Sequence, residues 1–408
     1  MRPCRDIFFP PAEPLGRRQT FTFSHKIRHR RNRFFCDARK DTFLKFLFIE
    51  PFAVGSHLLF AQGLAAHSRH DIRIISLPGE NFRWRMLGAA IYLADAIENL
   101  DCYDGVIVTD LFNLADFKAL TCGKCPPVLV YFHENQLTYP QPAKDRSIRL
   151  LSMINISTAL AADQVVFNSE FHQGVFLAAV PEFLSRAKDC RPVGVAERIR
   201  DKSSILYPGI DLSPEIEPDF SLRPDSPLII WNHRWGFDKN PKLFFQALEE
   251  IDRQGLDFRL AVTGENFGMI PDGFARAKEI FKDRIVAFGY VPSRADYLKL
   301  LREGDIVIST AIQENFGMSV IEAMILGCLP LLPNRLAYPE ILPEEFHAHC
   351  LYKNRHDLRE KLVRILAGSH PFDETRKTIA QKMTSFLWEN VIDAYDDVLE
   401  ELGNRRGD

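Results

Sequence analysis

The sequence lacks the features that mark membrane-spanning, secreted and disulfide-rich proteins. No apolar run approaches the roughly 18 residues that a membrane span needs. The first residues have no continuous apolar core before their arginines, so they do not form a secretory signal. Only eight cysteines are spread over 408 residues, which argues against a disulfide scaffold and favours a reduced, cytoplasmic protein.

The glycine motifs of common nucleotide-binding proteins are missing as well. Neither the dinucleotide-binding pattern G-x-G-x-x-G nor the P-loop pattern G-x-x-x-x-G-K-[ST] occurs. No D-x-D occurs either, so a metal ion that bridges a diphosphate has no obvious ligands. The composition, with 46% hydrophobic and 26% charged residues, is that of an ordinary globular enzyme.

Positive charge is concentrated at the start of the chain. Residues 1–41 hold 11 Lys/Arg against 4 Asp/Glu, residues 42–212 hold 16 against 18, and residues 213–408 hold 24 against 32. The basic segment 25–33 is suited to contact a polyanion. The alternative, which composition favours, is a disordered leader or the product of an upstream start codon.

Short apolar runs alternate with stretches of helical periodicity from residue 43 onward. The runs are nearly continuous in apolar residues, which is typical of parallel strands buried on both faces. Two such series are joined by a stretch rich in proline, serine and acidic residues. Strands are predicted at 45–50, 71–77, 104–110, 126–134, 164–170 and 203–209, then at 227–234, 258–264, 284–290, 305–310 and 329–333.

This alternation predicts an α/β protein with two Rossmann-like, doubly wound domains that face each other across a cleft. The expected divisions are a basic leader at 1–41, the first domain at 42–210, a linker at 211–227, the second domain at 228–380 and a final helix at 381–408 that crosses back to the first domain.

The second domain opens with two cations around a turn between a strand and a helix. Arg234 follows the strand, and Lys239 precedes the helix by a few residues. Such a turn offers free backbone N–H groups to an anion, so a guanidinium and an ammonium there would form a diphosphate clamp. A pair of surface cations that happens to flank a loop is an equally good interpretation on local grounds.

Two glutamates lie eight positions apart in a second strand-loop-helix unit. Glu314 stands in the loop, Gly317 allows the backbone to approach a ligand, and Glu322 lies two turns into the helix. Glu314 would accept hydrogen bonds from a sugar, and the two oxygens of Glu322 would hold a ribose. An isolated pair of this kind is more often a solvated helix face, but the glycine and the strand end favour a ligand site.

The order of these residues resembles the nucleotide-sugar site of retaining glycosyltransferases of family 4, which have the GT-B architecture. The resemblance extends from about residue 43 to 400 and includes the segment 207–212, which is similar to the interdomain segment of the family. It implies that the N-terminal domain binds the acceptor and the C-terminal domain a nucleotide sugar. The residues that carry the implied donor site are Arg234, Lys239, Glu314, Phe316, Gly317 and Glu322.

In the first half, the same resemblance points to residues after two strands. Gly55, Ser56 and His57 would form a turn before the first helix, under the donor and the acceptor. His133 ends a buried strand where the family has a histidine that contacts the donor sugar. By itself, a lone histidine at a strand end is more often structural.

The segment 131–140 narrows the resemblance to the tRNA-queuosine alpha-mannosyltransferases. His133 is followed by Glu134 and Asn135 in the run H-E-N-Q-L-x-Y-P, and segments 82–86, 165–172 and 231–241 are similar as well. Glu134 and Asn135 join Ser56 and His57 as candidates for the acceptor side. Two features of this sequence differ from that family. They are the basic leader and the lack of a clear nucleic-acid surface in the folded halves.

Two further patterns have open interpretations. The segment with Arg83, Trp84 and Arg85 could stack on a base with its arginines on phosphates, or it could begin a helix with Trp84 buried. Cys122 and Cys125 have the spacing of a metal or redox pair, but no second pair exists, so a loop with two free thiols is the better interpretation.

The resemblance implies a retaining transfer of mannose from GDP-mannose to the cyclopentenediol of queuosine, in a tRNA of the tRNA-Asp type. His133 and Glu314 would be catalytic, and neither a cofactor nor a metal ion is expected. Cations and helix N-termini would stabilise the leaving diphosphate, with the acceptor attacking on the same face. The alternatives are a lipid, cell-wall sugar or small metabolite as acceptor, and a non-catalytic sensor of nucleotide sugars. The oligomeric state stays open.

Overall fold

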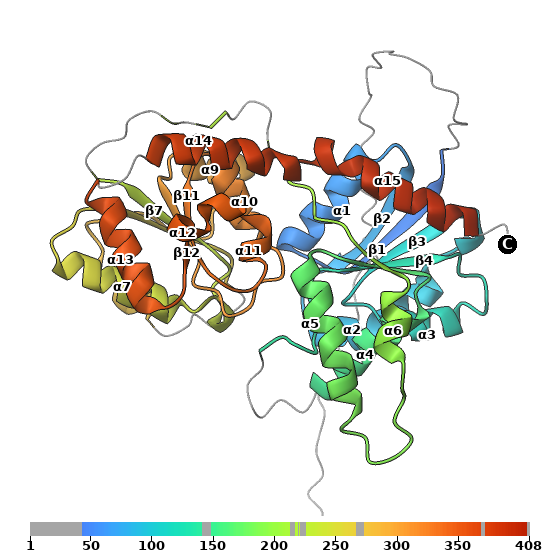
Figure 1. Cartoon of the computed structure of the whole chain (residues 1–408). Coiled ribbons are helices and arrows are strands. Elements are labelled where there is room, and N and C mark those ends of the chain that lie inside the picture. Colours follow the sequence, from blue (N-terminus) through green and yellow to red (C-terminus); the bar gives the residue numbers. More distant parts are fainter. Residues whose placement is uncertain are drawn as a thin grey trace, which may run out of the picture. The chain divides into compact units, whose positions relative to one another are not determined.

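Two parallel β-sheets, one in each half of the chain, organise the protein (Figure 1). The computed structural model describes residues 43–140, 148–212, 217–218, 220, 226–266, 273–368 and 372–405. The predicted leader at 1–41 and most of the predicted linker at 211–227 therefore lie outside the described residues. The predicted α/β class with two doubly wound sheets is confirmed.

The first sheet has the strand order β2-β1-β3-β4-β5-β6, and all of its pairings are parallel. Its six strands match the six predicted runs. They are β1 (Lys45–Ala53), β2 (Asp71–Pro78), β3 (Gly105–Thr109), β4 (Val128–Phe132), β5 (Gln164–Phe167) and β6 (Ser203–Ile205). Parallel strands covered on both faces by helices explain the nearly continuous apolar runs.

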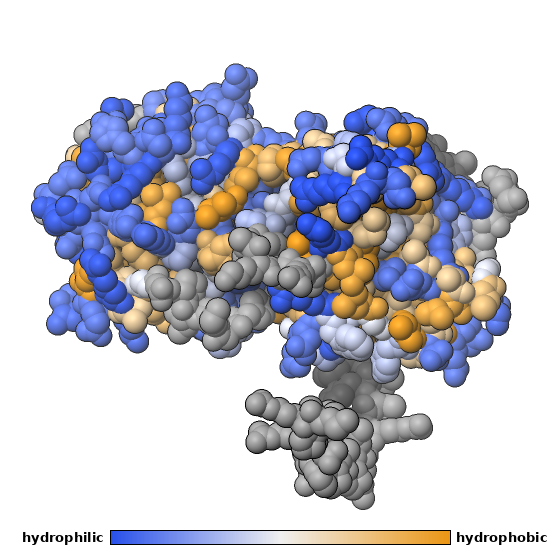
Figure 2. Space-filling view, turned by 90° about the horizontal axis from the view of Figure 1, so that it is seen from below, coloured by the Kyte–Doolittle hydropathy of each residue, from blue (hydrophilic) through white to orange (hydrophobic). Residues whose placement is uncertain are grey.

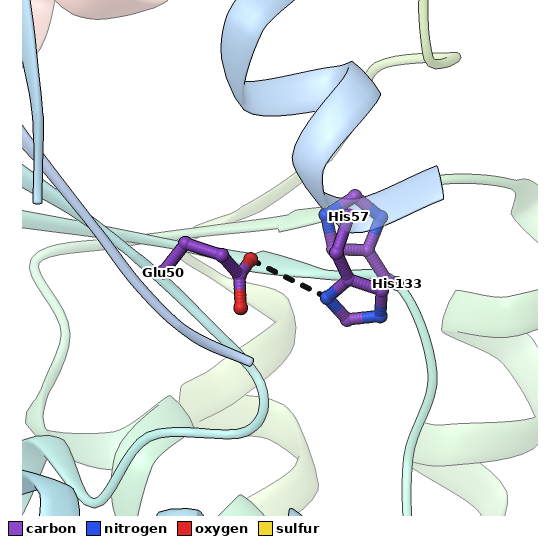
Figure 3. A group of neighbouring side chains, drawn as sticks. All are labelled: Glu50, His57 and His133. Atoms are coloured by element: carbon purple, nitrogen blue, oxygen red, sulfur yellow. Dashed lines mark hydrogen bonds and ion pairs between the residues drawn. The ribbon is translucent and has the colours of Figure 1, made fainter. Parts of the chain in front are cut away.

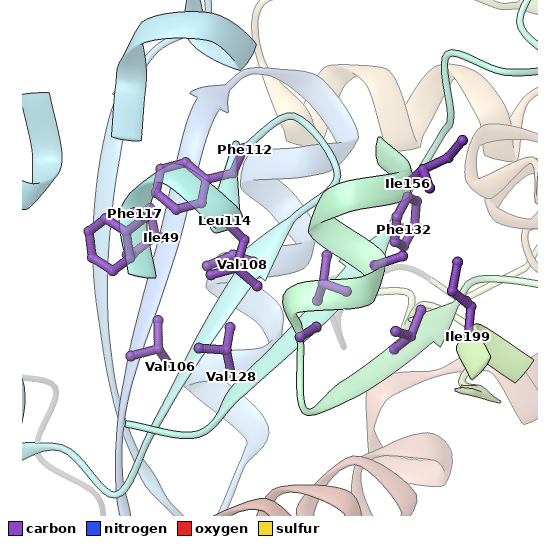
Figure 4. Packing of buried hydrophobic residues seen from close by; sticks show 14 of the residues in the cluster. Ile49, Val106, Val108, Phe112, Leu114, Phe117, Val128, Phe132, Ile156 and Ile199 are labelled. Atoms are coloured by element: carbon purple, nitrogen blue, oxygen red, sulfur yellow. The ribbon is translucent and has the colours of Figure 1, made fainter. Parts of the chain in front are cut away.

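Helices cover this sheet, and their apolar side chains complete its core. They are α1 (Gly55–His67), α2 (Phe82–Ala96), α3 (Leu114–Leu120), α4 (Ile148–Ala161), α5 (Glu170–Leu184) and α6 (Val195–Arg200), with a short 3₁₀ turn at Leu100–Cys102. Figure 4 shows strand residues such as Val108 and Phe132 packed against helix residues such as Phe117 and Ile156. Helices α3 and α6, of seven and six residues, are too short to show a clear periodicity in the sequence.

The second sheet has the order β12-β11-β10-β7-β8-β9. Its strands are β7 (Leu228–Asn232), β8 (Arg259–Thr263), β9 (Ile285–Gly289), β10 (Ile306–Ile308), β11 (Leu329–Pro333) and the unpredicted two-residue β12 (Leu351–Tyr352). The helices are α7 (Pro241–Arg253), α8 (Phe274–Ile280), α9 (Arg294–Arg302), α10 (Met318–Ile325), α11 (Tyr338–Ile341), α12 (His347–Cys350) and α13 (Arg355–Leu366). Short 3₁₀ turns occur at Phe237–Lys239 and Glu344–Phe346.

The tail consists of α14 (Phe372–Met383), a 3₁₀ turn at Thr384–Phe386 and α15 (Trp388–Asn404). Apolar residues three or four positions apart, among them Trp388, Ile392 and Tyr395, pack α15 on Phe46 and Phe48 of the first sheet. Figure 1 shows α15 lying along that sheet. The final helix therefore contributes to the core of the first half.

Two chain segments that link the halves run side by side. Ile210 and Leu387 form a parallel bridge, with the Ile210 N–H donating to the Phe386 carbonyl at 2.8 Å. The Trp388 ring lies directly against Gly63 and Gly209, where an added Cβ would come within 2.0 and 2.1 Å of it. These two glycines are therefore required by the close approach of the indole.

Charged and polar residues gather at the carboxyl ends of the strands in both sheets. Glu50 lies near the end of β1, Asp110 and His133 follow β3 and β4, and Arg234 follows β7. Ligands of doubly wound sheets bind at this edge, so the topology alone directs attention to these residues. None of the described helices has the length and apolar composition that crossing a bilayer requires.

Candidate functional site

The predicted diphosphate clamp is organised by a buried carboxylate. Arg234 donates to both oxygens of Asp238 at 3.1 Å, and the Lys239 ammonium lies 3.4 Å from the same carboxylate. Burial opposes the charge of Arg234, but Asp238 and the Tyr139 hydroxyl outweigh it and raise the pKa of Arg234. Asp238 therefore fixes two cations on one short turn, as a clamp for an anion requires.

The same turn is tied to the loop that bears Glu314. Lys239 donates to the Glu314 carboxylate at 3.1 Å and to the Gln313 carbonyl at 2.8 Å. The Asp238 carbonyl accepts from the backbone N–H of Ile312 at 2.7 Å. The structure thus brings together Arg234, Lys239 and Glu314, which the sequence predicted for the donor site.

The loop around Glu314 rests on the core. Gly317 has φ 100°, a value that favours glycine, and it caps α10. Phe316 is only 2% exposed and stacks on Tyr207, with the Phe386 ring edge-on at 5.4 Å. The side chain of Phe316 therefore packs the interior, and its donor contact stays a prediction.

Glu322, the residue predicted to hold a ribose, uses both carboxylate oxygens within the protein. One oxygen accepts from Arg294 at 2.5 Å and the other from the Tyr297 hydroxyl at 3.2 Å. Tyr297 in turn accepts from the Asn232 amide at 3.0 Å. Glu322 thus lies on α10 with each carboxylate oxygen aimed at a hydrogen-bond donor, the arrangement that two ribose hydroxyls would use.

The glycine loop of the first half differs in detail from the prediction. Gly55, Ser56 and His57 form the first turn of α1 and not a turn before it. Gly55 has φ 51° and Ser56 is exposed, so both backbone N–H groups lie at a helix N-terminus. A Cβ added to Gly55 would lie 3.9 Å from the Glu265 carboxylate.

His57 forms a buried pair with a glutamate that the sequence analysis did not consider. Its Nδ1 lies 3.3 Å from Glu50, which points toward two imidazole rings (Figure 3). Burial disfavours a charged ring, but the charge and hydrogen bond of Glu50, with Asp110 and Glu134, raise the pKa of His57 to about 9. The N-terminal end of α1 opposes this charge by only about 0.3–1 kcal/mol. At neutral pH the ring is therefore an imidazolium.

His133 is the second ring of this pair. The centroids of the His57 and His133 rings are 4.3 Å apart, and Phe60 lies edge-on to His133 at 4.8 Å. Burial first, and then the charge of His57, lowers the pKa of His133 well below its usual range. Its Nε2 is buried and has no hydrogen-bond partner among the described residues. A neutral imidazole with a free nitrogen is suited to bind a sugar hydroxyl.

Asp110 supports the backbone that carries His133. One of its oxygens accepts from the N–H groups of His133 and Glu134 at 2.8 and 3.3 Å. The other oxygen is buried without a partner in the described part of the chain. Burial raises the pKa of Asp110, because an ionised carboxylate loses its hydration there.

The remaining residues of the H-E-N segment differ in their exposure. Glu134 is partly exposed and accepts from the Gln136 amide at 3.0 Å. Asn135 is buried, and its side-chain oxygen accepts from the N–H groups of Leu137 and Thr138. Glu134 is therefore accessible to an acceptor, whereas Asn135 shapes the turn.

Hydrogen bonds connect the two predicted halves of the site. Arg234 donates to the Tyr139 hydroxyl, with its Nη2 2.8 Å from the phenolic oxygen. The Asn315 amide donates to the His133 carbonyl at 3.2 Å, and the Ser169 hydroxyl donates to the Asn315 carbonyl at 2.5 Å. The loop that carries Glu314 and the strand end that carries His133 are therefore adjacent.

The acceptor candidates on α2 lie on the surface. Trp84 is 65% exposed, so the interpretation that buried it is wrong. Arg83 is exposed with its guanidinium 5.3 Å from the Phe82 ring, and Arg85 donates to the Pro78 carbonyl. Figure 2, which views the face where α2 and α4 lie in Figure 1, shows apolar patches interrupted by hydrophilic residues. An exposed tryptophan between two arginines is available to stack on a base.

One group of side chains has the spacing of a metal site. Ligand atoms of Glu50, His57 and His133 lie within 4.8 Å of one another. The same atoms form the ion pair between Glu50 and His57, so a metal ion bound there would have to replace that pair. Cys122 and Cys125 are free thiols, and burial raises the pKa of Cys125 to about 11, which makes it a poor thiolate ligand.

Five residues of the site escaped the sequence analysis, and some of them left a signal. An acidic residue closes each of two otherwise apolar strands, and another stands between the two clamp cations. The contact of Tyr139 with Arg234 joins residues 95 positions apart, and that of Arg294 with Glu322 joins residues 28 positions apart. Such contacts leave no local pattern in the sequence. The five residues are Glu50, Asp110, Tyr139, Asp238 and Arg294.

Comparison with protein families gives two matches, one in each half of the chain. The model of the tRNA-queuosine alpha-mannosyltransferase N-terminal domain matches residues 45–210, and the model of the glycosyl transferases group 1 matches residues 213–385. The tRNA-queuosine alpha-mannosyltransferase of Drosophila melanogaster is 35% identical over 345 residues, which cover 81% of this chain and 89% of that relative.

More distant relatives share parts of the chain or the fold. The GDP-mannose:cellobiosyl-diphosphopolyprenol alpha-mannosyltransferase of Xanthomonas oryzae is 20% identical over 175 residues, 42% of this chain and 46% of that protein. Sucrose-phosphate synthase from Thermosynechococcus elongatus has a TM-score of 0.66 at 15% identity, covering 88% of this chain and 99% of its own. A glycosyltransferase from Rickettsia africae has a TM-score of 0.61 at 18% identity, covering 88% and 98%. These structures share the two-domain fold.

Proposed function

The chain belongs to the tRNA-queuosine alpha-mannosyltransferase family, and from this premise we propose that it transfers mannose from GDP-mannose to the cyclopentenediol of queuosine in tRNA, with retention of configuration. The observation that carries this proposal is the meeting of two residue sets at adjacent strand ends. Arg234, Lys239 and Glu314 supply the charges that a nucleotide sugar needs. His133 faces the same loop through Asn315.

In the proposed donor complex, the diphosphate replaces internal partners of the clamp. Arg234 is partly exposed. Its guanidinium keeps the ion pair with Asp238 and exchanges the Tyr139 hydroxyl for a phosphate oxygen. The ribose hydroxyls take the place of Tyr297 and Arg294 on Glu322. The sugar then lies between Glu314 and His133, whose free Nε2 binds a hydroxyl.

The proposed reaction needs no metal ion. The glycosidic bond to the diphosphate breaks while the acceptor oxygen attacks the anomeric carbon from the same face, and the departing phosphate takes the acceptor proton. Arg234 and Lys239 stabilise the negative charge that develops on the diphosphate, as preorganised groups do at low cost in reorganisation. No covalent intermediate is part of this scheme. With a tRNA as the acceptor, the proposed reaction belongs in the cytoplasm.

The experiment that tests this function compares tRNA from cells with and without the protein. Bulk tRNA is digested to nucleosides, and mass spectrometry detects glycosylated queuosine. The modified nucleoside should disappear without the protein, and purified protein with GDP-mannose should restore it. If purified protein leaves queuosine-containing tRNA unchanged but glycosylates a lipid or a small sugar, the acceptor in this proposal is wrong.

A further inference from the structure

The first turn of α5, in the first half of the chain, is capped by a residue of the second half. The backbone N–H groups of Glu170 and Phe171 donate to the two carboxylate oxygens of Glu340 at 2.7 and 2.8 Å. The first N–H groups of a helix have no acceptor within the helix, so they need partners from elsewhere. Glu340 lies on α11, which follows β11 of the second sheet, 170 positions further along the chain than Glu170. The cap of α5 is therefore complete only while the second half lies against the first.

The same end of α5 is joined to the active-site segments of both halves. Ser169, the N-cap of α5, is fully buried, and its hydroxyl donates to the Asn315 carbonyl in the loop after β10. The side-chain amides of Asn315 and Asn168 both donate to the His133 carbonyl, at 3.2 and 2.9 Å. The N-terminus of α5 is thus the place where contacts from the second half and from the strand end of His133 meet.

The charge of Glu340 makes its contact with α5 a strong one. Hydrogen bonds to an ionised acceptor are roughly twice as strong as neutral ones, and the N-terminus of a helix is the positive end of its dipole. Another charged contact between the halves, that of Arg234 with the Tyr139 hydroxyl, is exchanged for a phosphate in the proposed donor complex. Glu340 contacts none of the residues that the proposal assigns to the donor, so its cap can stay in place while the donor is bound.

We propose that Glu340 is a positioning residue for glycosyl transfer: by capping α5 across the two halves, it holds the loop that carries Glu314 against the strand end that carries His133. It acts through Ser169 and Asn315, which lie between the cap and His133. This inference rests on the proposed function only for the reaction that is measured. The geometry of the cap does not depend on that reaction.

The change that tests the proposal is Glu340→Ala, which removes both acceptor oxygens. The N–H groups of Glu170 and Phe171 then bond to water whether or not the halves lie together, so the cap no longer favours the arrangement that transfer needs. The kcat with tRNA should fall by about tenfold or more, which is the effect of losing one charge-assisted hydrogen bond. The affinity for GDP in titration calorimetry should be unchanged, because the residues proposed to bind the donor lie in the second half.

Glu340→Gln separates the charge of the side chain from its volume. The amide keeps one acceptor oxygen but places an N–H₂ group against an N–H group of α5, so kcat should fall, although by less than in Glu340→Ala. A side chain that only filled space would tolerate this change.

Glu345→Ala is the matched control, because it removes an exposed carboxylate of the same half that pairs with Lys382 and not with α5. Its kcat should equal that of the wild type. The proposal is overturned if Glu340→Gln keeps the wild-type kcat, or if Glu340→Ala loses GDP affinity as much as it loses kcat.

Hydrogen exchange in the wild-type protein keeps the inference testable if the variants unfold. The amides of Glu170 and Phe171 should exchange slowly, like that of Gln173, which donates to the Ser169 carbonyl within the helix. NMR on the protein without substrate measures each rate. If the first two amides exchange as fast as those of an unstructured peptide while Gln173 is protected, the cap does not form and the proposal is wrong. Because this readout needs no substrate, it separates a failure of the inference from a failure of the proposed function.

Discussion

The two sides of the site hold charge in different ways. On the first-half side, Glu50 and Asp110 are fully buried, and their contacts are to backbone N–H groups, to one hydroxyl and to one ring. On the second-half side, Arg234 and Glu314 are partly exposed and contact other side chains. Groups of the first kind are fixed by the fold, whereas those of the second kind can exchange a protein partner for a ligand.

This difference suggests a division of work. In the proposed donor complex, the second half would bind the donor by replacing ion pairs that already exist, so the cations would be positioned before the donor arrives. In the same proposal, the buried contacts of Glu50 and Asp110 in the first half would stay in place during the reaction. Substitutions in the two regions should therefore differ in whether they change binding, catalysis or stability.

The largest expected effect concerns Phe316, a buried residue in the loop that carries Glu314. Phe316→Ala removes a buried ring from between Tyr207 and Phe386, so the free energy of unfolding should fall by about 3–5 kcal/mol. Denaturant unfolding measures this loss, and GDP affinity is measured under native conditions. Phe316→Leu should lose much less. An unchanged stability together with a weaker affinity for GDP would instead make Phe316 the donor contact that the resemblance implied.

The clamp itself should affect binding and not stability. Arg234→Ala removes a charge-assisted contact of about 1.5–3 kcal/mol, so GDP affinity should fall by about tenfold or more. The stability should change little, because Arg234 is partly exposed. Arg276→Ala, which removes an exposed ion pair with Glu249 on the same domain, is the control and should leave GDP affinity unchanged. Equal affinities for Arg234→Ala and the wild type in titration calorimetry would remove the clamp from the proposed site.

These regions also differ in how well the sequence predicted them. The second-half site was accessible because Arg234, Lys239, Glu314 and Glu322 stand at fixed spacings in strand-loop-helix units, which the structure retains. Phe316 shares that spacing, but its burial depends on Tyr207 and Phe386, which are distant in sequence. Spacing therefore located the loop but could not tell which of its side chains face inward.

The sequence predicted only part of the network in the first half of the chain. His57 and His133 were identified by their strand ends and by resemblance, but Glu50 was included in an apolar run and passed over. The pair between Glu50 and His57 depends on the angle at which α1 leaves β1, and that angle is set by tertiary packing. The strand order that places β1 beside β3, and β3 beside β4, also brings Asp110 next to His133.

A smaller effect is expected at the proposed tRNA surface. Trp84→Ala removes an exposed ring whose stacking on a base is worth about 1–3 kcal/mol, so glycosylation of tRNA should fall while GDP affinity and stability stay unchanged. Tyr92→Ala, on the same helix and equally exposed, is the control. The measurement is kcat/KM with tRNA at two salt concentrations. If Trp84→Ala unfolds the protein or loses GDP binding, the placement of the acceptor is wrong.

The smallest expected effect is that of removing metal ions. The charges that would stabilise the diphosphate are supplied by Arg234 and Lys239, and the spacing of Glu50, His57 and His133 is used by an ion pair that a metal ion would have to break. Glycosylation should therefore persist in excess EDTA, and elemental analysis of the purified protein should find substoichiometric zinc. A Mg²⁺-dependent enzyme assayed in the same buffer controls for complete chelation. Activity that EDTA abolishes and Mg²⁺ or Mn²⁺ restores would place a metal ion on the diphosphate, against the second-half clamp. Activity that only Zn²⁺ restores would place the ion on the two histidines, and the His57 imidazolium would have to be abandoned with it.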